Sequence, residues 1–189
     1  MNIRLASDLQ PDSIVDGPGI RTVIWTQGCS HNCEGCQNPS THDFNGGFSV
    51  NVEDVKKELD SLLGQQGITL SGGDSMFQAK ACAEIAKHAK EIGLNVWCYT
   101  GFTFEQALKN KDMLELLKYT DVLVDGKFDK SQFSLNLDFR GSRNQRIIDV
   151  QKSLEEKKPV IIEKYMKERT HKIEVPRKKH IYNSQENSF

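Results

Sequence analysis

The run Ile20-Arg-Thr-Val-Ile-Trp-Thr26 is followed almost at once by Gly28-Cys-Ser-His-Asn-Cys-Glu-Gly-Cys-Gln-Asn38. The first run is rich in β-branched residues and predicts a strand. The second places Cys29, Cys33 and Cys36 on one loop directly after that strand. Closed structural zinc sites and electron-transferring clusters use four protein ligands, whereas three ligands leave one coordination position for another molecule. The loop therefore predicts a metal centre with an open position.

The identity of the metal stays open at this point. Thiolates are soft ligands that suit both iron–sulfur clusters and zinc. A cluster held by three cysteines keeps one iron free to bind a small molecule. In the zinc alternative, His31 or His42 would complete a Cys₃His site. The spacing favours the cluster, and His31, which has polar neighbours, is expected to be solvated rather than a ligand.

Length and composition narrow the class of protein. The chain has 189 residues, 37% hydrophobic and 27% charged, which fits one soluble globular domain. The formal net charge of -1 gives no basic field for nucleic acid. No long apolar run and no N-terminal signal pattern is present, so we expect no membrane segment and a cytoplasmic protein. Five cysteines, three of them crowded, do not fit a secreted disulfide framework.

Strand and helix patterns alternate along the chain. Helices are predicted over residues 51–63, 78–92 and 104–119, and further strands over residues 68–70, 94–99 and 121–124. Alternating βα units predict an α/β fold with a mostly parallel sheet and right-handed crossovers. Ligands of such sheets bind at the carboxyl ends of the strands.

Four short segments follow the predicted strands and are expected to meet at one edge of the sheet: the cysteine loop and residues 71–74, 99–101 and 125–127. Gly72 and Gly73 would let the backbone approach a ligand closely, although a Gly-Gly turn alone is common. Asp125 and Lys127 could hold a charged ligand, but without context we favour a surface ion pair. The convergence of these segments predicts one functional site.

The remaining cysteines and the C-terminal part carry weaker signals. Cys82 lies on the apolar face of a predicted helix and Cys98 inside a predicted strand, so both are expected to be core residues. We divide the chain into a catalytic domain over residues 1–150 and a largely polar and basic extension over residues 151–189. Residues 159–163 could add a strand, and most of residues 164–189 is expected to be a flexible tail.

The spacing Cys29-x₃-Cys33-x₂-Cys36 resembles the cluster motif of the radical S-adenosylmethionine (SAM) enzymes. Val-Asp-Gly-Pro-Gly-Ile-Arg at residues 15–21 and Gln-Asn at residues 37–38 are similar to the activases of glycyl-radical enzymes. Among these, the chain most resembles the family of anaerobic ribonucleoside-triphosphate reductase activating proteins. That likeness rests on the short chain, on Gly35, on residues 70–74 and on residues 121–128, and it extends over about residues 8–150.

The resemblance implies a fold and a reaction. The fold would be a partial, open β/α barrel of the radical SAM type; a full eight-fold barrel needs about 250 residues. A [4Fe–4S] cluster on Cys29, Cys33 and Cys36 would bind SAM at its fourth iron. Reductive cleavage would give a 5′-deoxyadenosyl radical that takes hydrogen from a glycine of the partner, an anaerobic ribonucleoside-triphosphate reductase. The electron donor would be a flavodoxin or a ferredoxin.

The resemblance also implies the cofactor contacts, with no catalytic residue beyond the cofactor site. Gly35, Cys36 and Gln37 would line the SAM site. The methionine amino group of SAM would be received by Gly72, Gly73 and Asp74. SAM would also be contacted by Asp125 and Lys127.

Two departures and two alternatives accompany this interpretation. Many radical SAM proteins carry an aromatic residue where Gly35 stands, so adenine must be bound differently here. Asp74 stands where glutamate is common in the superfamily. One alternative is an activase of another glycyl-radical enzyme, such as formate lyase. The other, from a different class, is a non-catalytic zinc-binding module.

Overall fold

The computed structural model describes residues 1–169, and residues 170–189 of the predicted tail lie outside the described residues. One eight-stranded sheet organises the fold, in the order β4-β1-β3-β5-β6-β7-β8, with β2 paired to β3 beside this path. The strands are β1 (Asn2–Leu5), β2 (Gln10–Ser13), β3 (Arg21–Thr26), β4 (Phe48–Asn51), β5 (Gly67–Gly72), β6 (Asn95–Tyr99), β7 (Val122–Asp125) and β8 (Arg146–Asp149).

The centre of the sheet is parallel, as the alternating pattern predicts. β3, β5, β6 and β7 pair in parallel with their neighbours. β1 and β2 are antiparallel to β3, β4 is antiparallel to β1, and β8 is antiparallel to β7. Five strands (β3, β4, β5, β6 and β7) therefore run one way and three run the other. Since β4 and β8 stand at the two ends of this strand order, the described sheet is open.

The helices match the predicted segments closely. They are α1 (Val52–Ser61), α2 (Ala79–Glu91), α3 (Phe104–Ala107), α4 (Lys111–Tyr119) and α5 (Val150–Glu156), with 3₁₀ turns η1 (Pro39–Thr41), η2 (Ser75–Gln78), η3 (Lys130–Gln132) and η4 (Glu163–Tyr165). The predicted helix start before α1 is confirmed, because the Asn51 side chain accepts a hydrogen bond from the Glu53 amide. No helix among residues 1–169 is long and apolar enough to cross a membrane.

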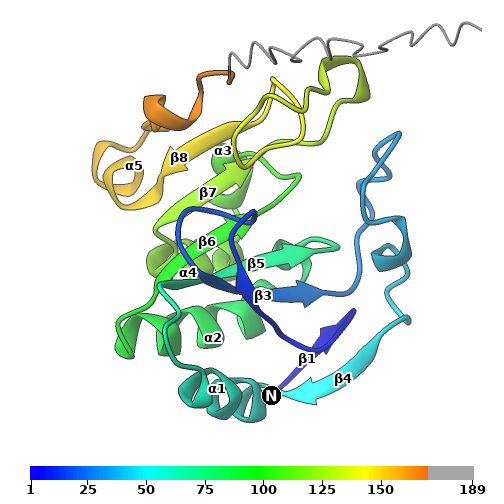
Figure 1. Ribbon diagram of the computed structural model, residues 1–189, viewed down its shortest axis with the longest axis vertical. Helices are drawn as coiled ribbons and strands as arrows, with labels where there is room; N and C mark the ends of the chain where they lie inside the picture. The colour runs from blue at the N-terminus through cyan, green and yellow to red at the C-terminus, as the bar shows by residue number, and fades with distance from the viewer. Residues whose placement is uncertain (170–189) are drawn as a thin grey trace, which may run out of the picture.

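The helices α1, α2 and α4 lie together along one face of the sheet (Figure 1). Alternate residues of β6 separate the two faces: Val96 and Cys98 belong to the core beneath the helices, whereas Trp97 and Tyr99 belong to a smaller cluster on the other face. That smaller cluster includes Tyr165, from the segment after α5. The expectation that Cys98 is a core residue is therefore confirmed, and Cys82 is equally buried.

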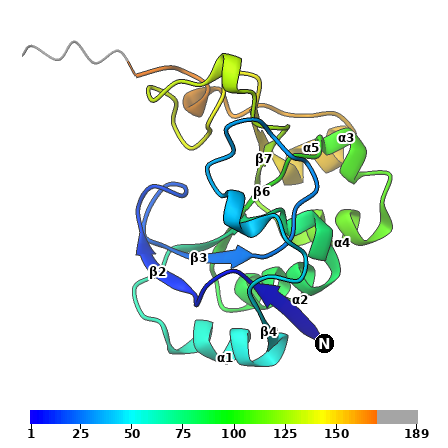
Figure 2. The ribbon, with the colours of Figure 1, turned by 90° about the vertical axis from the view of Figure 1, so that its right-hand side faces the viewer.

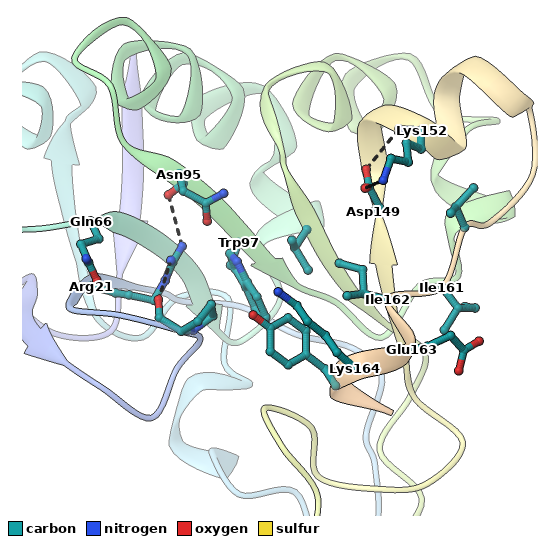
Figure 3. A pocket seen from close by; sticks show the side chains of 14 residues that line it. Arg21, Gln66, Asn95, Trp97, Asp149, Lys152, Ile161, Ile162, Glu163 and Lys164 are labelled. Atoms are coloured by element: carbon teal, nitrogen blue, oxygen red, sulfur yellow. Dashed lines mark hydrogen bonds and ion pairs between the residues drawn. The ribbon is translucent and has the colours of Figure 1, made fainter. Parts of the chain in front are cut away.

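A buried arginine ties the amino ends of the central strands together. Arg21 at the start of β3 donates from Nε to Thr69 Oγ1 at 2.7 Å and from a terminal nitrogen to the Asn95 carbonyl at 3.2 Å. Its guanidinium also lies over the Trp97 ring. Burial lowers the pKa of Arg21 to about 10. Figure 3 shows this residue beside a cavity of about 630 Å³, which lies at the opposite end of the sheet from the cysteines.

Residues 159–163 do not form a strand. Ile161 makes one isolated antiparallel bridge to Ile148 of β8, and the chain then enters η4. A single bridge gives this segment no continuous ladder, although it still extends the edge of the sheet beyond β8.

Candidate functional site

The three cysteines lie on the loop of residues 27–47, here called the cysteine loop, which leaves the carboxyl end of β3. Its base is fixed by backbone bonds from Gly28 N to Thr41 O at 2.8 Å and from Cys29 N to His42 O at 3.1 Å. The buried Gln27 side chain donates to the Asp43 carbonyl at 2.7 Å and so closes the loop from within. Figure 2 shows the cysteine loop near the segment of residues 126–145 that follows β7.

Cys29, Cys33 and Cys36 are free thiols, partly buried, and all three line one cavity of about 620 Å³. This volume is typical of a small-molecule site. In residues 1–169, no three His, Cys, Asp or Glu side chains are grouped closely enough to hold a metal ion. The three thiols share one cavity wall without converging on a single point, and their chemistry suits a cluster held by three cysteines with room for a further ligand.

The amide of Asn38 donates a hydrogen bond to the sulfur of Cys36 at 3.4 Å. Burial raises the pKa of Cys29 and of Cys33, and the backbone amides of His31 and Phe128 oppose that rise. Such donors stabilise anionic sulfur, which is how a protein tunes the potential of an iron–sulfur cluster.

The predicted glycine turn packs directly on the base of the cysteine loop. A Cβ at Gly72, which has φ +105°, would lie 2.5 Å from Thr26 O, and a Cβ at Gly73 would lie 2.5 Å from Gly28 O. Only glycine permits this approach. Both glycines line the cavity together with Gln37, so three of the predicted cofactor contacts share the wall that carries the cysteines.

Asp74 follows this turn, but its carboxylate faces the protein and not the cavity. It is 1% exposed. One oxygen accepts from the Met76 amide, and the other accepts from Thr100 Oγ1 at 2.9 Å, from the Gly101 amide at 2.8 Å and from His31 Nε2 at 2.6 Å. The Asp74 side chain therefore joins the ends of β5 and β6 to the cysteine loop.

The expectation that His31 is solvated was wrong. Its side chain is 9% exposed and is bonded to Asp74. The imidazole packs edge-on against Phe102, with ring centroids 4.6 Å apart, and also against Phe77 at 5.4 Å. Polar neighbours in the sequence misled the prediction, because the groups that bury His31 come from the ends of β5 and β6.

Asp125 is also buried, and its partner is not Lys127. Its two oxygens accept from Arg146, and one of them accepts from the Phe104 amide at 2.7 Å. Arg146 in turn forms a bidentate pair with Glu105, at 3.0 and 2.8 Å. The surface ion pair that the sequence favoured was therefore wrong. Asp125 fixes the carboxyl end of β7, where Gly126 lines the cavity.

Lys127 and Gly35 lie near the cysteines without lining the cavity. The Lys127 charge favours the thiolate of Cys33. Gly35 has φ +72°, and a Cβ there would lie 3.1 Å from Cδ of Lys130 and 3.7 Å from Phe128. The space in front of Gly35 is thus filled by residues of the 126–145 segment.

The sequence did not reveal the apolar wall of the cavity. Five side chains from the 126–145 segment form it: Phe128, Phe133, Leu135, Leu137 and Phe139. Leu135 is 86% exposed, and Val15, on the wall formed by the β2–β3 connection, is 73% exposed. No local periodicity marks these residues, because the segment is a loop.

A protein family described as "4Fe-4S single cluster domain" matches residues 15–148. The chain is 39% identical to the "Anaerobic ribonucleoside-triphosphate reductase-activating protein" of Enterobacteria phage T4, over 74% of this chain and 90% of that protein. Proteins with the same description from Vibrio cholerae and Escherichia coli K12 are 36% and 35% identical, each over 92% of its length. QueE of Escherichia coli, a solved structure, aligns at 13% identity over 55% of this chain and 54% of that one, with a TM-score of 0.44.

The matched domain and the three-thiol cavity define the class: this is a protein of the single-cluster 4Fe–4S type. Within that class, the chain belongs to the family of anaerobic ribonucleoside-triphosphate reductase-activating proteins.

Proposed function

We propose that this protein is an iron–sulfur- and SAM-dependent activase that installs a glycyl radical on an anaerobic ribonucleoside-triphosphate reductase. The observation that carries the proposal is the cavity at the carboxyl ends of the parallel strands, with three free thiols on one wall and a Gly-Gly turn beside them. Three thiols leave a fourth coordination position for a small molecule. The relatives named as activators of this reductase support the choice of partner.

Cys29, Cys33 and Cys36 would hold a [4Fe–4S] cluster. When bound, the cluster and SAM supply the reductive cleavage whose 5′-deoxyadenosyl radical removes hydrogen from a glycine of the reductase. The protein contributes the thiol ligands and the N–H donor at Cys36, and the apolar side chains of its 126–145 segment would limit the access of water to the cavity.

The remaining contacts to SAM are assigned with different roles. Gln37, Gly72 and Gly73 line the cavity and would contact SAM directly. Because the Asp74 carboxylate already accepts four hydrogen bonds, Asp74 would contribute through its main chain.

Three further residues would act from beside the cavity. Gly35 would line the SAM site next to Cys36, where its lack of a side chain admits Lys130 beside the loop. Asp125 would hold the Gly126 backbone in place, and Lys127 would supply positive charge near the cofactors.

The finer fold assignment belongs to the same proposal. The open sheet would be a partial β/α barrel of the radical SAM type, formed by a domain over residues 1–150, with residues 151–189 as an extension. An open sheet edge would admit a glycine-bearing segment of a large protein substrate. The electron would come from a flavodoxin or ferredoxin in the cytoplasm.

The first test is the cofactor content and SAM chemistry of anaerobically purified protein. We expect a brown protein with about four irons and four sulfides per chain, bleached by dithionite, that converts SAM to 5′-deoxyadenosine. The variant Cys33→Ala should lose both cluster and cleavage, and the matched variant Cys98→Ala should keep both. A colourless protein with one zinc per chain would contradict the proposal.

A further inference from the structure

The side chain of His31 connects residues 29–36, the part of the cysteine loop that carries the three cysteines, to the end of the sheet. The base of the loop is fixed by backbone bonds at Gly28 and Cys29. Between Cys29 and Cys36, the side-chain bonds to the rest of the protein are His31 to Asp74 and an exposed pair from Glu34 to Lys130. An exposed ion pair contributes little, so the buried bond of His31 dominates.

Neighbouring groups hold both partners of the His31–Asp74 hydrogen bond in place. Asp74 is held by Met76, Thr100 and Gly101, so its carboxylate cannot turn away. On the other side, a Cβ at Gly101 would lie 2.5 Å from the imidazole, which shows that the ring rests directly on this glycine. The carboxylate accepts, and His31 Nε2–H donates, in a water-poor setting where such bonds are strong.

The same residue lies midway between two of the cysteines. His31 comes two residues after Cys29 and two residues before Cys33. The path of the chain between them includes Asn32 at φ +50°, a conformation that residues other than glycine rarely adopt. A side chain anchored 2.6 Å from Asp74 fixes the path.

We propose that His31 and Asp74 form a positioning pair that holds the segment between Cys29 and Cys33 in the shape that presents both thiols to the cavity. The inference deepens the proposed function and rests on its assignment of the three thiols as cluster ligands. Asp74, at the end of β5, thereby acts on the cluster through the cysteine loop, and its role differs from that of Gly72 and Gly73, which line the cavity.

Two substitutions at His31 separate hydrogen bonding from packing. His31→Phe retains an aromatic ring among Phe77 and Phe102 but cannot donate to Asp74. His31→Gln donates an amide hydrogen but lacks the ring. His88→Gln is the control, because His88 in the last turn of α2 forms an exposed histidine–aspartate bond with Asp60 at 2.7 Å.

The first readout is the reduction of the bound cluster, followed by EPR in a potentiometric titration. Hydrogen bonds to the sulfurs and solvent exposure set the potential of a cluster, so a loosened segment between Cys29 and Cys33 changes that potential. We expect His31→Phe to change the ratio of reduced to oxidised cluster about tenfold at a fixed potential, a shift of about 59 mV for one electron. His31→Gln and His88→Gln should stay near wild type. A wild-type potential in His31→Phe would overturn the proposal.

The second readout does not need the cluster. In apo-protein, loss of the anchor should increase the alkylation rate of Cys29 about tenfold in His31→Phe, the factor expected for a lost charge-assisted hydrogen bond. His31→Gln should retain slow alkylation, and equal rates in all variants would overturn the proposal. If wild type holds a cluster but fails to activate the reductase, the proposed function fails while both readouts still test the positioning pair.

Discussion

The contact between the glycine turn and the base of the cysteine loop can be tested with Gly73→Ala. A methyl group at this position would lie 2.5 Å from Gly28 O and 2.8 Å from Gly28 C, both backbone atoms. Gly28 directly precedes the first cysteine, so the base of the loop must move to admit the methyl group. Overpacking of this kind costs about 1–3 kcal/mol. For a protein of this size, that corresponds to a fall in Tm of about 2–12 °C.

The effect on the cofactor follows from the same displacement. If about 1.4 kcal/mol of the strain falls on the cluster-bound shape of the loop, cluster retention falls about tenfold. The assay measures iron and sulfide per chain after anaerobic reconstitution and gel filtration, with Tm measured on the same samples.

The matched control is Gly93→Ala. Gly93 has φ +83° and open space around its Cβ position, so the added methyl group meets nothing but strains the backbone by about 1–2 kcal/mol. Gly73→Ala and Gly93→Ala should therefore lose similar Tm, while only Gly73→Ala loses cluster. Full cluster content and wild-type Tm in Gly73→Ala would refute the close approach on which the site is built.

Burial raises the pKa of Cys82 to about 12 and also raises the pKa of Cys98. We therefore expect neither thiol to react with iodoacetamide at pH 8 in the native apo-protein. Mass spectrometry that finds either cysteine labelled before unfolding would contradict this expectation. Hydrogen bonds to Arg146 lower the pKa of Glu105 to about 2. The pair therefore stabilises the folded protein fully above about pH 4.5, and this contribution is lost as the pH falls toward 2. The Tm of Glu105→Gln should therefore converge with that of wild type over this range, and a constant difference would show that the pair does not titrate. Leu135 is 86% exposed at the cavity wall, where the reductase would contact it. Leu135→Asp should therefore lower the yield of reductase radical about fivefold more than it lowers SAM cleavage. Equal losses of the two activities would place its effect within the cofactor site.

Local sequence patterns predicted the parallel centre of the fold. β3 and α1 follow from β-branched residues and from helical spacing, respectively. The four-residue strands β1, β2, β4 and β8 were missed. They are too short to show a period, and their pairing depends on partners elsewhere in the sheet, such as Asn2 with Asn51.

The site was predictable where chemistry is encoded by neighbours in the sequence. The three cysteines and the Gly-Gly turn are of this kind. The partners of the buried carboxylates are not, because His31 lies 43 residues from Asp74, and Arg146 lies 21 residues from Asp125. Both pairs form only when the ends of several strands meet, and no spacing rule specifies them.

The central claim is that this chain makes a glycyl radical on an anaerobic ribonucleoside-triphosphate reductase. The most direct measurement is EPR after anaerobic mixing of the protein with the reductase, SAM and a reductant. We predict a glycyl-radical signal that requires all four components and that is absent with Cys33→Ala. No signal with the reductase, from protein that holds its cluster and cleaves SAM, would contradict the claim, and a signal with formate lyase in its place would identify a different partner.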